Sequence, residues 1–178
     1  MLSYPHFDTL DYLVNGTSVQ QAAYRVLTGH DTWKKLAPFS PVLTGTIPIN
    51  IDIENSDLDI LCQYEDQKGY IENLMDNFSQ YPGFRFYESN FQDTPTIVAS
   101  FRLETFPVEI FAQPTPVKAQ QAYRHMMVEH YLLQKNDAAF RQQIIDLKKE
   151  GYKTEPAFAQ LLNLAGNPYE ALLQIPLS

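Results

Sequence analysis

Residues 41–63 of this chain read P-V-L-T-G-T-I-P-I-N-I-D-I-E-N-S-D-L-D-I-L-C-Q. The stretch holds a short β-type run, a glycine followed by a hydroxyl residue, a connector, and an Asp-x-Asp motif in a second apolar run. Side chains two positions apart on a strand share a face, so Asp57 and Asp59 project together, away from Leu58 and Ile60. Neighbouring carboxylates repel each other unless a cation lies between them, and the motif therefore indicates a divalent-cation site.

Two further features belong with this motif. Glu109 stands in F-P-V-E-I-F at residues 106–111, where an ionised acid among apolar residues is costly unless it is paired or ligates a metal. Pro107 indicates that this segment starts a strand or runs along an edge. Gly45 follows a strand-like run and lets the backbone approach a phosphate, to which Thr46 can donate hydrogen bonds.

The rest of the chain alternates between helical and strand-like zones. The first zone, up to about residue 37, is expected to be helical. Thr17 or Ser18 would cap a helix in it that ends at Gly29. One helix, from 67 to about 81, is expected within the middle zone. The strands that we expect there are 42–44, 57–63, 84–88, 96–103 and 106–111.

After a proline break at 114–116 the pattern is helical again. The expected helices are 118–134, one opened by Asn136 or Asp137 and closed by Gly151, one with Thr154 before it and Gly166 after it, and a last turn at 168–172. The order predicts an α/β (α+β) fold, a mixed sheet with helices on one face. We divide it into a core, 1–116, and a C-terminal helical subdomain packed on it, 117–178.

Charge and composition narrow the functional classes. The formal net charge is −8, which repels polyanions, so long nucleic acid is not an expected partner. Cys62 is the single cysteine and is expected to be a reduced, packed thiol. No window reaches the roughly 20 apolar residues of a membrane span, and no secretory leader is visible. We therefore expect a cytoplasmic protein that does not contact the membrane.

The chain resembles the nucleotidyltransferase superfamily, with its DNA polymerase beta-like fold, over residues 41–111. That superfamily combines a Gly-Ser or Gly-Gly pair, a connector, an Asp-x-Asp or Asp-x-Glu strand and a later acidic strand. The phrases G-T-I-P-I-N-I-D-I-E-N-S-D-L-D-I, P-V-E-I-F, A-Y-R-H-M and T-E-P-A-F-A-Q-L-L look like one bacterial family of unknown function within it. The resemblance implies a mixed β-sheet flanked by helices.

The same resemblance implies a Mg²⁺-dependent enzyme that uses a nucleoside triphosphate, with ATP expected. Gly45 and Thr46 would hold the phosphates, Asp57 and Asp59 would bind magnesium, and Glu109 would be the third acid, as ligand or base. The enzyme would transfer a nucleoside monophosphate to a hydroxyl of a small molecule or protein. The chain departs from the superfamily pattern at Thr46, which adds a methyl group, and at Glu109, where many members carry Asp.

Two more residues are candidates for the nucleotide, each with an ordinary explanation beside the functional one. Arg124, on the helix expected at 118–134, is a fixed cation that can reach a phosphate, although such arginines are usually solvated. Ser56 precedes the acids and equally suits a turn cap.

The acids and the helices also have ordinary explanations. Asp57 and Asp59 are typical of edge-strand acids that prevent aggregation, and Arg102 would explain Glu109 through a salt bridge. The rival function is a non-catalytic nucleotide-binding or antitoxin-like partner-binding protein. The C-terminal helices would serve equally as an acceptor-binding lid or a homodimer contact.

Overall fold

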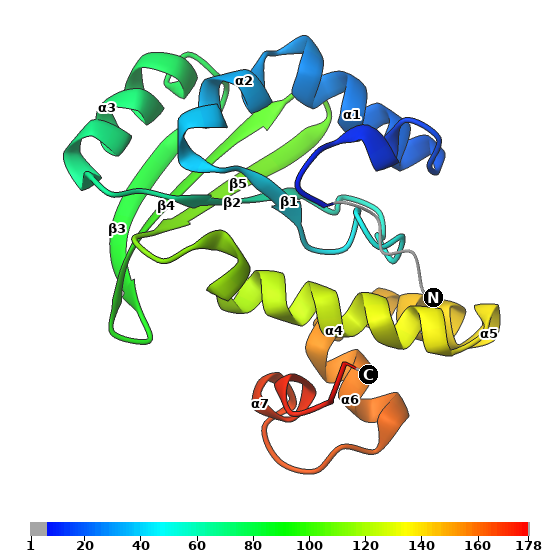
Figure 1. The fold of residues 1–178 in the computed structure, drawn as a ribbon. Helices are drawn as coiled ribbons and strands as arrows, with labels where there is room; N and C mark the ends of the chain where they lie inside the picture. The colour runs from blue at the N-terminus through cyan, green and yellow to red at the C-terminus, as the bar shows by residue number, and fades with distance from the viewer. Residues whose placement is uncertain (1–6, 178) are drawn as a thin grey trace.

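The computed structural model describes residues 7–177, in which a five-stranded mixed sheet lies between two groups of helices (Figure 1). The strands are β1 (Val42–Thr44), β2 (Leu58–Gln63), β3 (Arg85–Phe91), β4 (Thr94–Leu103) and β5 (Phe106–Gln113). The α-helices are α1 (Ser18–Gly29), α2 (Thr32–Leu36), α3 (Gln67–Phe78), α4 (Gln121–Lys135), α5 (Ala138–Lys149), α6 (Thr154–Leu162) and α7 (Pro168–Leu173). The predicted α+β class is confirmed.

The sheet has the strand order β1-β2-β5-β4-β3. The central pair, β2 and β5, is parallel, and the other three neighbouring pairs are antiparallel. A parallel pair needs a long crossover, and here the chain from β2 to β5 passes through α3 and the β3–β4 hairpin. The Asp-x-Asp strand therefore lies inside the sheet, and the edges are β1 and β3.

The two faces of the sheet carry separate apolar cores. Leu58 and Ile60 of β2 and Ile110 of β5 point to one face, where they pack with residues of α1, α2 and α3. Leu61 of β2 and Phe111 of β5 point to the other face, where they pack with residues of α4, α5, α6 and α7. Figure 1 shows α1, α2 and α3 on one side of the sheet and α4 on the other. The expectation of helices on one face is therefore wrong. The side chains of β2 and β5 that point to either face include apolar residues, so both faces are covered by helices and neither is left to solvent.

Helix starts agree with the capping residues of the sequence. Thr17 caps α1 in a capping box with Gln20, and Asp66 accepts hydrogen bonds from the first turn of α3. Asp137 and Asn167 cap α5 and α7 in the same way. The predicted helix at 118–134 instead begins at Gln121, after a 3₁₀ turn at Val117–Ala119.

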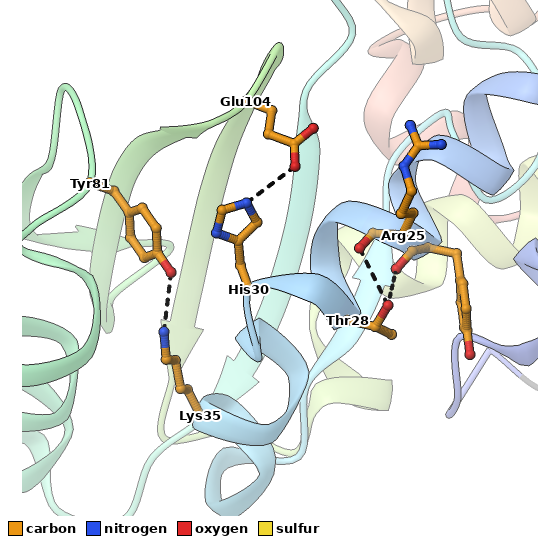
Figure 2. A network of polar contacts seen from close by, with 7 residues as sticks. Arg25, Thr28, His30, Lys35, Tyr81 and Glu104 are labelled. Carbon is orange, nitrogen blue, oxygen red and sulfur yellow. Dashed lines mark hydrogen bonds and ion pairs between the residues drawn. The ribbon is translucent and has the colours of Figure 1, made fainter.

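A polar network ties the α1–α2 corner to the sheet and to the end of α3 (Figure 2). His30 Nε2 lies 3.3 Å from Glu104 Oε1 in the β4–β5 turn, and Lys35 Nζ donates to the Tyr81 hydroxyl at 3.1 Å. Both pairs are partly solvated, so each is worth at most about 1 kcal/mol. This network fixes the corner of the fold, and none of its residues lines the cavity described below.

Three expectations concern the chain as a whole. Cys62 is buried and unpaired, as expected for a packed thiol. No helix in residues 7–177 has both the length and the apolar character that a bilayer crossing requires. The expected core, 1–116, includes six residues outside the described part, and its division from the helical subdomain at 117–178 stays a prediction.

Candidate functional site

The central strand pair brings two of the predicted acids together. Asp59 of β2 and Glu109 of β5 are Cα partners in the parallel ladder and share the face that looks toward α4. Asp57 lies one residue before β2, so the strand starts slightly later than predicted. β2 is an interior strand, which removes the explanation of these acids as edge protection.

Gly45 brings the backbone against the Asp-x-Asp strand. Thr44, just before it, pairs with Asp59 in the β1–β2 ladder. Gly45 has φ +76°, a left-handed conformation that L side chains rarely adopt. A Cβ at this position would collide with Oδ2 of Asp59. The backbone conformation therefore favours glycine here, and any larger residue would force the Asp59 carboxylate to move.

The acids interact electrostatically. Burial, followed by the charges of Asp57 and Glu109, raises the pKa of Asp59 to about 8, against the opposing effect of Lys148. Desolvation and Asp57 also raise the pKa of Glu109, while Arg85 and Lys153 lower it. Such mutual repulsion is what a bound cation relieves.

Glu109 does not lie among apolar side chains, as its sequence neighbours suggested. Val108 and Ile110 point to the other face, and Glu109 is solvent-accessible. The proposed salt bridge with Arg102 is absent from the described ion pairs, and Arg102 donates instead to the Thr105 carbonyl at 3.0 Å.

The connector between Gly45 and Asp57 is held by long side chains from two helices. Gln20 of α1 donates to the Ile47 carbonyl at 2.9 Å and to the Pro48 carbonyl at 3.1 Å. From α5, Arg141 donates to the Ile49 and Asn50 carbonyls, and Lys148 Nζ donates to the Ile51 carbonyl at 2.7 Å. The connector thus satisfies its carbonyls without forming a regular element.

Ser56 closes the last turn of this connector. The Ile53 N–H donates to Ser56 Oγ at 2.9 Å, and the Ser56 N–H donates to the Ile53 carbonyl at 3.0 Å. The turn-cap interpretation is therefore confirmed. This turn places Asp57 at the start of β2.

A cavity of about 630 Å³ opens over this face of the sheet. Six predicted site residues line it, namely Gly45, Thr46, Ser56, Asp57, Asp59 and Glu109. Arg124 is exposed and does not line it. On α4 the lining positions are 121, 122, 125, 126 and 129, and Arg124 lies off that stripe of the helix. The structure therefore gives no support to Arg124 as a phosphate contact.

The helical wall of the cavity carries charged residues that the sequence did not identify as site residues. They are Glu129 of α4, Lys148 of α5 and Glu155 of α6. Glu129 is 3% exposed and Lys148 is 7% exposed. The sequence did contain a signal for Glu129 and Lys148, because both lie on the apolar stripe of their helices. Glu129 comes three residues after Met126, and Lys148 comes four residues after Ile144. A charge on a buried stripe is uncommon and indicates a role at that position.

The acids of the sheet suit magnesium chemically, because hard cations prefer carboxylate oxygens. Asp57, Asp59 and Glu109 would hold the ion, and the absence of a Cβ at Gly45 leaves room beside Asp59. Within residues 7–177, no three His, Cys, Asp or Glu side chains already stand as a metal-binding group. Ligation by these three acids is therefore a prediction.

Comparisons with known proteins place the fold. The model of a domain of unknown function, DUF4269, matches residues 25–175. No curated protein matches the chain.

Solved structures of nucleotidyl-transferring enzymes match over most of the chain. The GLD-2/RNP-8 complex matches 85% of this chain and 60% of its own at 15% identity, with a TM-score of 0.53. The Cid1 poly(U) polymerase with Mg 3'-dATP bound matches 96% and 54% at 16% identity, with a TM-score of 0.52. The chain spans between 39% and 60% of the length of such structures. At these identities the likeness shows the nucleotidyltransferase fold alone.

Proposed function

This chain belongs to the DUF4269 family and has the nucleotidyltransferase fold, and from that premise we propose that it is a magnesium-dependent nucleotidyltransferase. The reaction is transfer of a nucleoside monophosphate from a nucleoside triphosphate, with ATP preferred, to a hydroxyl of a small molecule or protein. The Cid1 structures have Mg 3'-dATP or MgGTP bound, which supports a magnesium nucleotide as the substrate here.

One observation carries the proposal. Asp59 and Glu109 lie side by side on one face of the parallel β2–β5 pair, Asp57 comes one residue before β2, and Gly45 lies against Asp59. All four line one cavity. No packing requirement explains three mutually repelling carboxylates that gather at the central β2–β5 pair, whereas a phosphate-bound cation does.

The residues of the chain would divide the chemistry as follows. Gly45 and Thr46 bind the triphosphate through backbone N–H groups and a hydroxyl. Asp57 and Asp59 hold magnesium, which supplies positive charge against the triphosphate and its developing negative charge. Glu109, whose raised pKa makes it a stronger base, orients the acceptor hydroxyl and takes its proton. The acceptor oxygen then bonds to the α-phosphorus as the bond to the β-phosphate oxygen breaks and pyrophosphate leaves.

The test is transfer of label from α-³²P-labelled ATP, GTP, CTP or UTP to acceptors in a cell extract, with magnesium present. We expect labelled product with the wild-type protein and none with Asp59→Asn. Glu109→Gln should abolish turnover and largely spare binding of Mg-ATP. Asp76→Asn, a matched change on the exposed face of α3, should behave as wild type. Undiminished transfer by Asp59→Asn would remove these acids from the mechanism.

A second candidate keeps the site and lacks the reaction: a nucleotide-binding or antitoxin-like protein of the same fold. Isothermal titration with Mg-ATP distinguishes the two candidates. Binding without label transfer supports the binding protein. If the protein neither binds Mg-ATP nor transfers label, the acids have a structural role. Cid1 is a poly(U) polymerase, so the expectation that long nucleic acid is not a partner here also stays a prediction. A homodimer is likewise untested.

A further inference from the structure

The helical wall of the cavity contains acids that the proposed reaction does not use. Glu129 of α4 and Glu155 of α6 line the same cavity as the sheet acids. With Glu54, Asp57, Asp59 and Glu109, six acids line it, against Lys148 and Lys153. Magnesium accounts for Asp57, Asp59 and Glu109, and Glu54 of the connector is exposed to solvent, so the two glutamates on the helices remain without a role.

Glu129 is buried and lacks a direct partner. It is 3% exposed, and within the described residues its carboxylate accepts no hydrogen bond and forms no ion pair. Lys148 is the cation that acts on it, but the Lys148 ammonium donates to the Ile51 carbonyl. The Glu129 oxygens are not among the buried side-chain atoms that lack a partner, so they reach the cavity, where a ligand can donate hydrogen bonds to them.

Glu155 lies close enough to act on Glu129 and is itself only partly compensated. Its carboxylate is 3.5 Å from His125 Nδ1. His125 Nε2 faces the Tyr169 carbonyl at 2.8 Å, and since a carbonyl only accepts, Nε2 carries the proton. The repulsion between Glu155 and Glu129 helps to raise the pKa of Glu129 to about 8, after burial.

The walls beside these acids also suit a cation. Tyr152 and Tyr169 line the cavity, and both are exposed. Aromatic faces attract ammonium groups, and two glutamates offer several acceptors for the three hydrogens of a primary ammonium. A phosphate or carboxylate would be repelled here.

We propose that Glu129 and Glu155 form a subsite that binds a primary ammonium group on the acceptor, which makes the acceptor an amine-bearing alcohol. The identification of this ligand as the acceptor rests on the proposed function. The ammonium-binding site itself is argued only from the residues described above. The ammonium would anchor the acceptor at the helical wall, and its hydroxyl would face Glu109 and the nucleotide.

Isothermal titration with spermidine tests this subsite without knowledge of the acceptor. The titration is done above pH 8, where the Glu129 carboxyl is ionised. Spermidine should bind the wild-type protein there, and Glu129→Gln and Glu155→Gln should each weaken binding at least about tenfold, as expected when a buried charge loses its partner. Glu150→Gln, the same charge change on an exposed residue outside the cavity, should bind as wild type. Melting temperatures show whether each variant is folded. If Glu129→Gln does not fold, Glu155→Gln, at a less buried position, tests the subsite alone.

Failure of spermidine to bind, or equal binding by wild type and both variants, would overturn the subsite. Mg-ATP is titrated into the same proteins and should bind all of them alike. Failure of Mg-ATP to bind the wild-type protein would refute the proposed function and would not affect the conclusion from spermidine. Mg-ATP binding without spermidine binding would refute only the ammonium subsite.

Discussion

Residue 45 is constrained both by its backbone and by its neighbour. Gly83 provides a matched comparison, because it also has a positive φ, +73°, but a Cβ there would meet nothing within 4 Å. Both Gly45→Ala and Gly83→Ala should cost on the order of 1–2 kcal/mol of unfolding free energy from the left-handed backbone. Gly45→Ala should lose more, and should also lose Mg-ATP affinity, because its Cβ displaces the Asp59 carboxylate.

Denaturant titration and isothermal titration measure the two effects. Equal losses of stability for the two variants, with Mg-ATP affinity retained by both, would contradict a role for Gly45 beside Asp59.

Glu129 makes stability depend on pH. Its pKa rises from an ordinary value of 4.5 to about 8 in the fold, so between these values the folded protein keeps a proton that the unfolded chain releases. The unfolding free energy therefore falls as pH rises through this window, by up to roughly 1.4 kcal/mol per pH unit for one proton. Asp59 adds a slope of the same sign, since its pKa is also raised to about 8.

Glu129→Gln should flatten this dependence and stabilise the protein most at the upper end of the window, at about pH 8. Chemical denaturation at several pH values measures the slope, with Glu150→Gln as the control. A slope that is the same in both variants and the wild type would refute the burial of an uncompensated Glu129.

Asp57 and Asp59 were predictable as a pair, because side chains two positions apart in an extended segment share a face. The roles of Glu129 and Lys148 could not be predicted from the sequence, because the apolar stripe of a helix indicates which residues are buried but not which cavity they line. Arg124 illustrates the limit from the other side. Its neighbours Ala122 and His125 line the cavity, but the turn of the helix carries Arg124 to solvent.

At the scale of elements, the connector depends on α1 as much as on its own residues. Gln20 accepts from the Thr17 N–H within the capping box and donates to two connector carbonyls. Gln20→Glu keeps the acceptor and removes the donor, so it separates the cap from the anchor. We expect a loss of about 1–3 kcal/mol, because two buried carbonyls lose their donor and face a carboxylate.

Amide hydrogen exchange reports where that loss is felt. The Ile51 N–H, which donates to the Thr46 carbonyl, should exchange faster in Gln20→Glu. Gln21→Glu, at the exposed neighbouring position, should leave that amide unchanged. Protection of Ile51 that is the same in both variants would show that α1 does not hold the connector.

Helices and strands were predicted where a cap or an alternating pattern marks them. Thr17 and Asp137 mark helix starts, and β1 has the predicted bounds. The hairpin strands β3 and β4 extend toward their turn beyond the predicted bounds, because cross-strand pairing continues through polar residues such as Ser89. Pairing of this kind is a tertiary property that local propensity does not report.

At the scale of the whole molecule, the site lies where the two helical groups and the sheet meet. α1 and α5 hold the connector, β2 and β5 carry the acids, and α4, α5 and α6 supply the opposite wall. A single sequence indicates each element but not the crossover that sets β5 beside β2. That crossover brings Glu109 to Asp59 across about 50 residues of chain, a separation for which no local pattern is informative.

The central claim is that Asp57 and Asp59 hold the magnesium of a bound nucleotide, with Glu109 beside it as the base. The most direct measurement is anomalous scattering from crystals grown with Mn²⁺, in place of Mg²⁺, and a non-hydrolysable ATP analogue. We predict a peak within about 2.0–2.2 Å of oxygens of Asp57 and Asp59, beside Glu109, with the phosphates against Gly45. A peak at other residues, or bound nucleotide with no metal at these acids, would contradict the account.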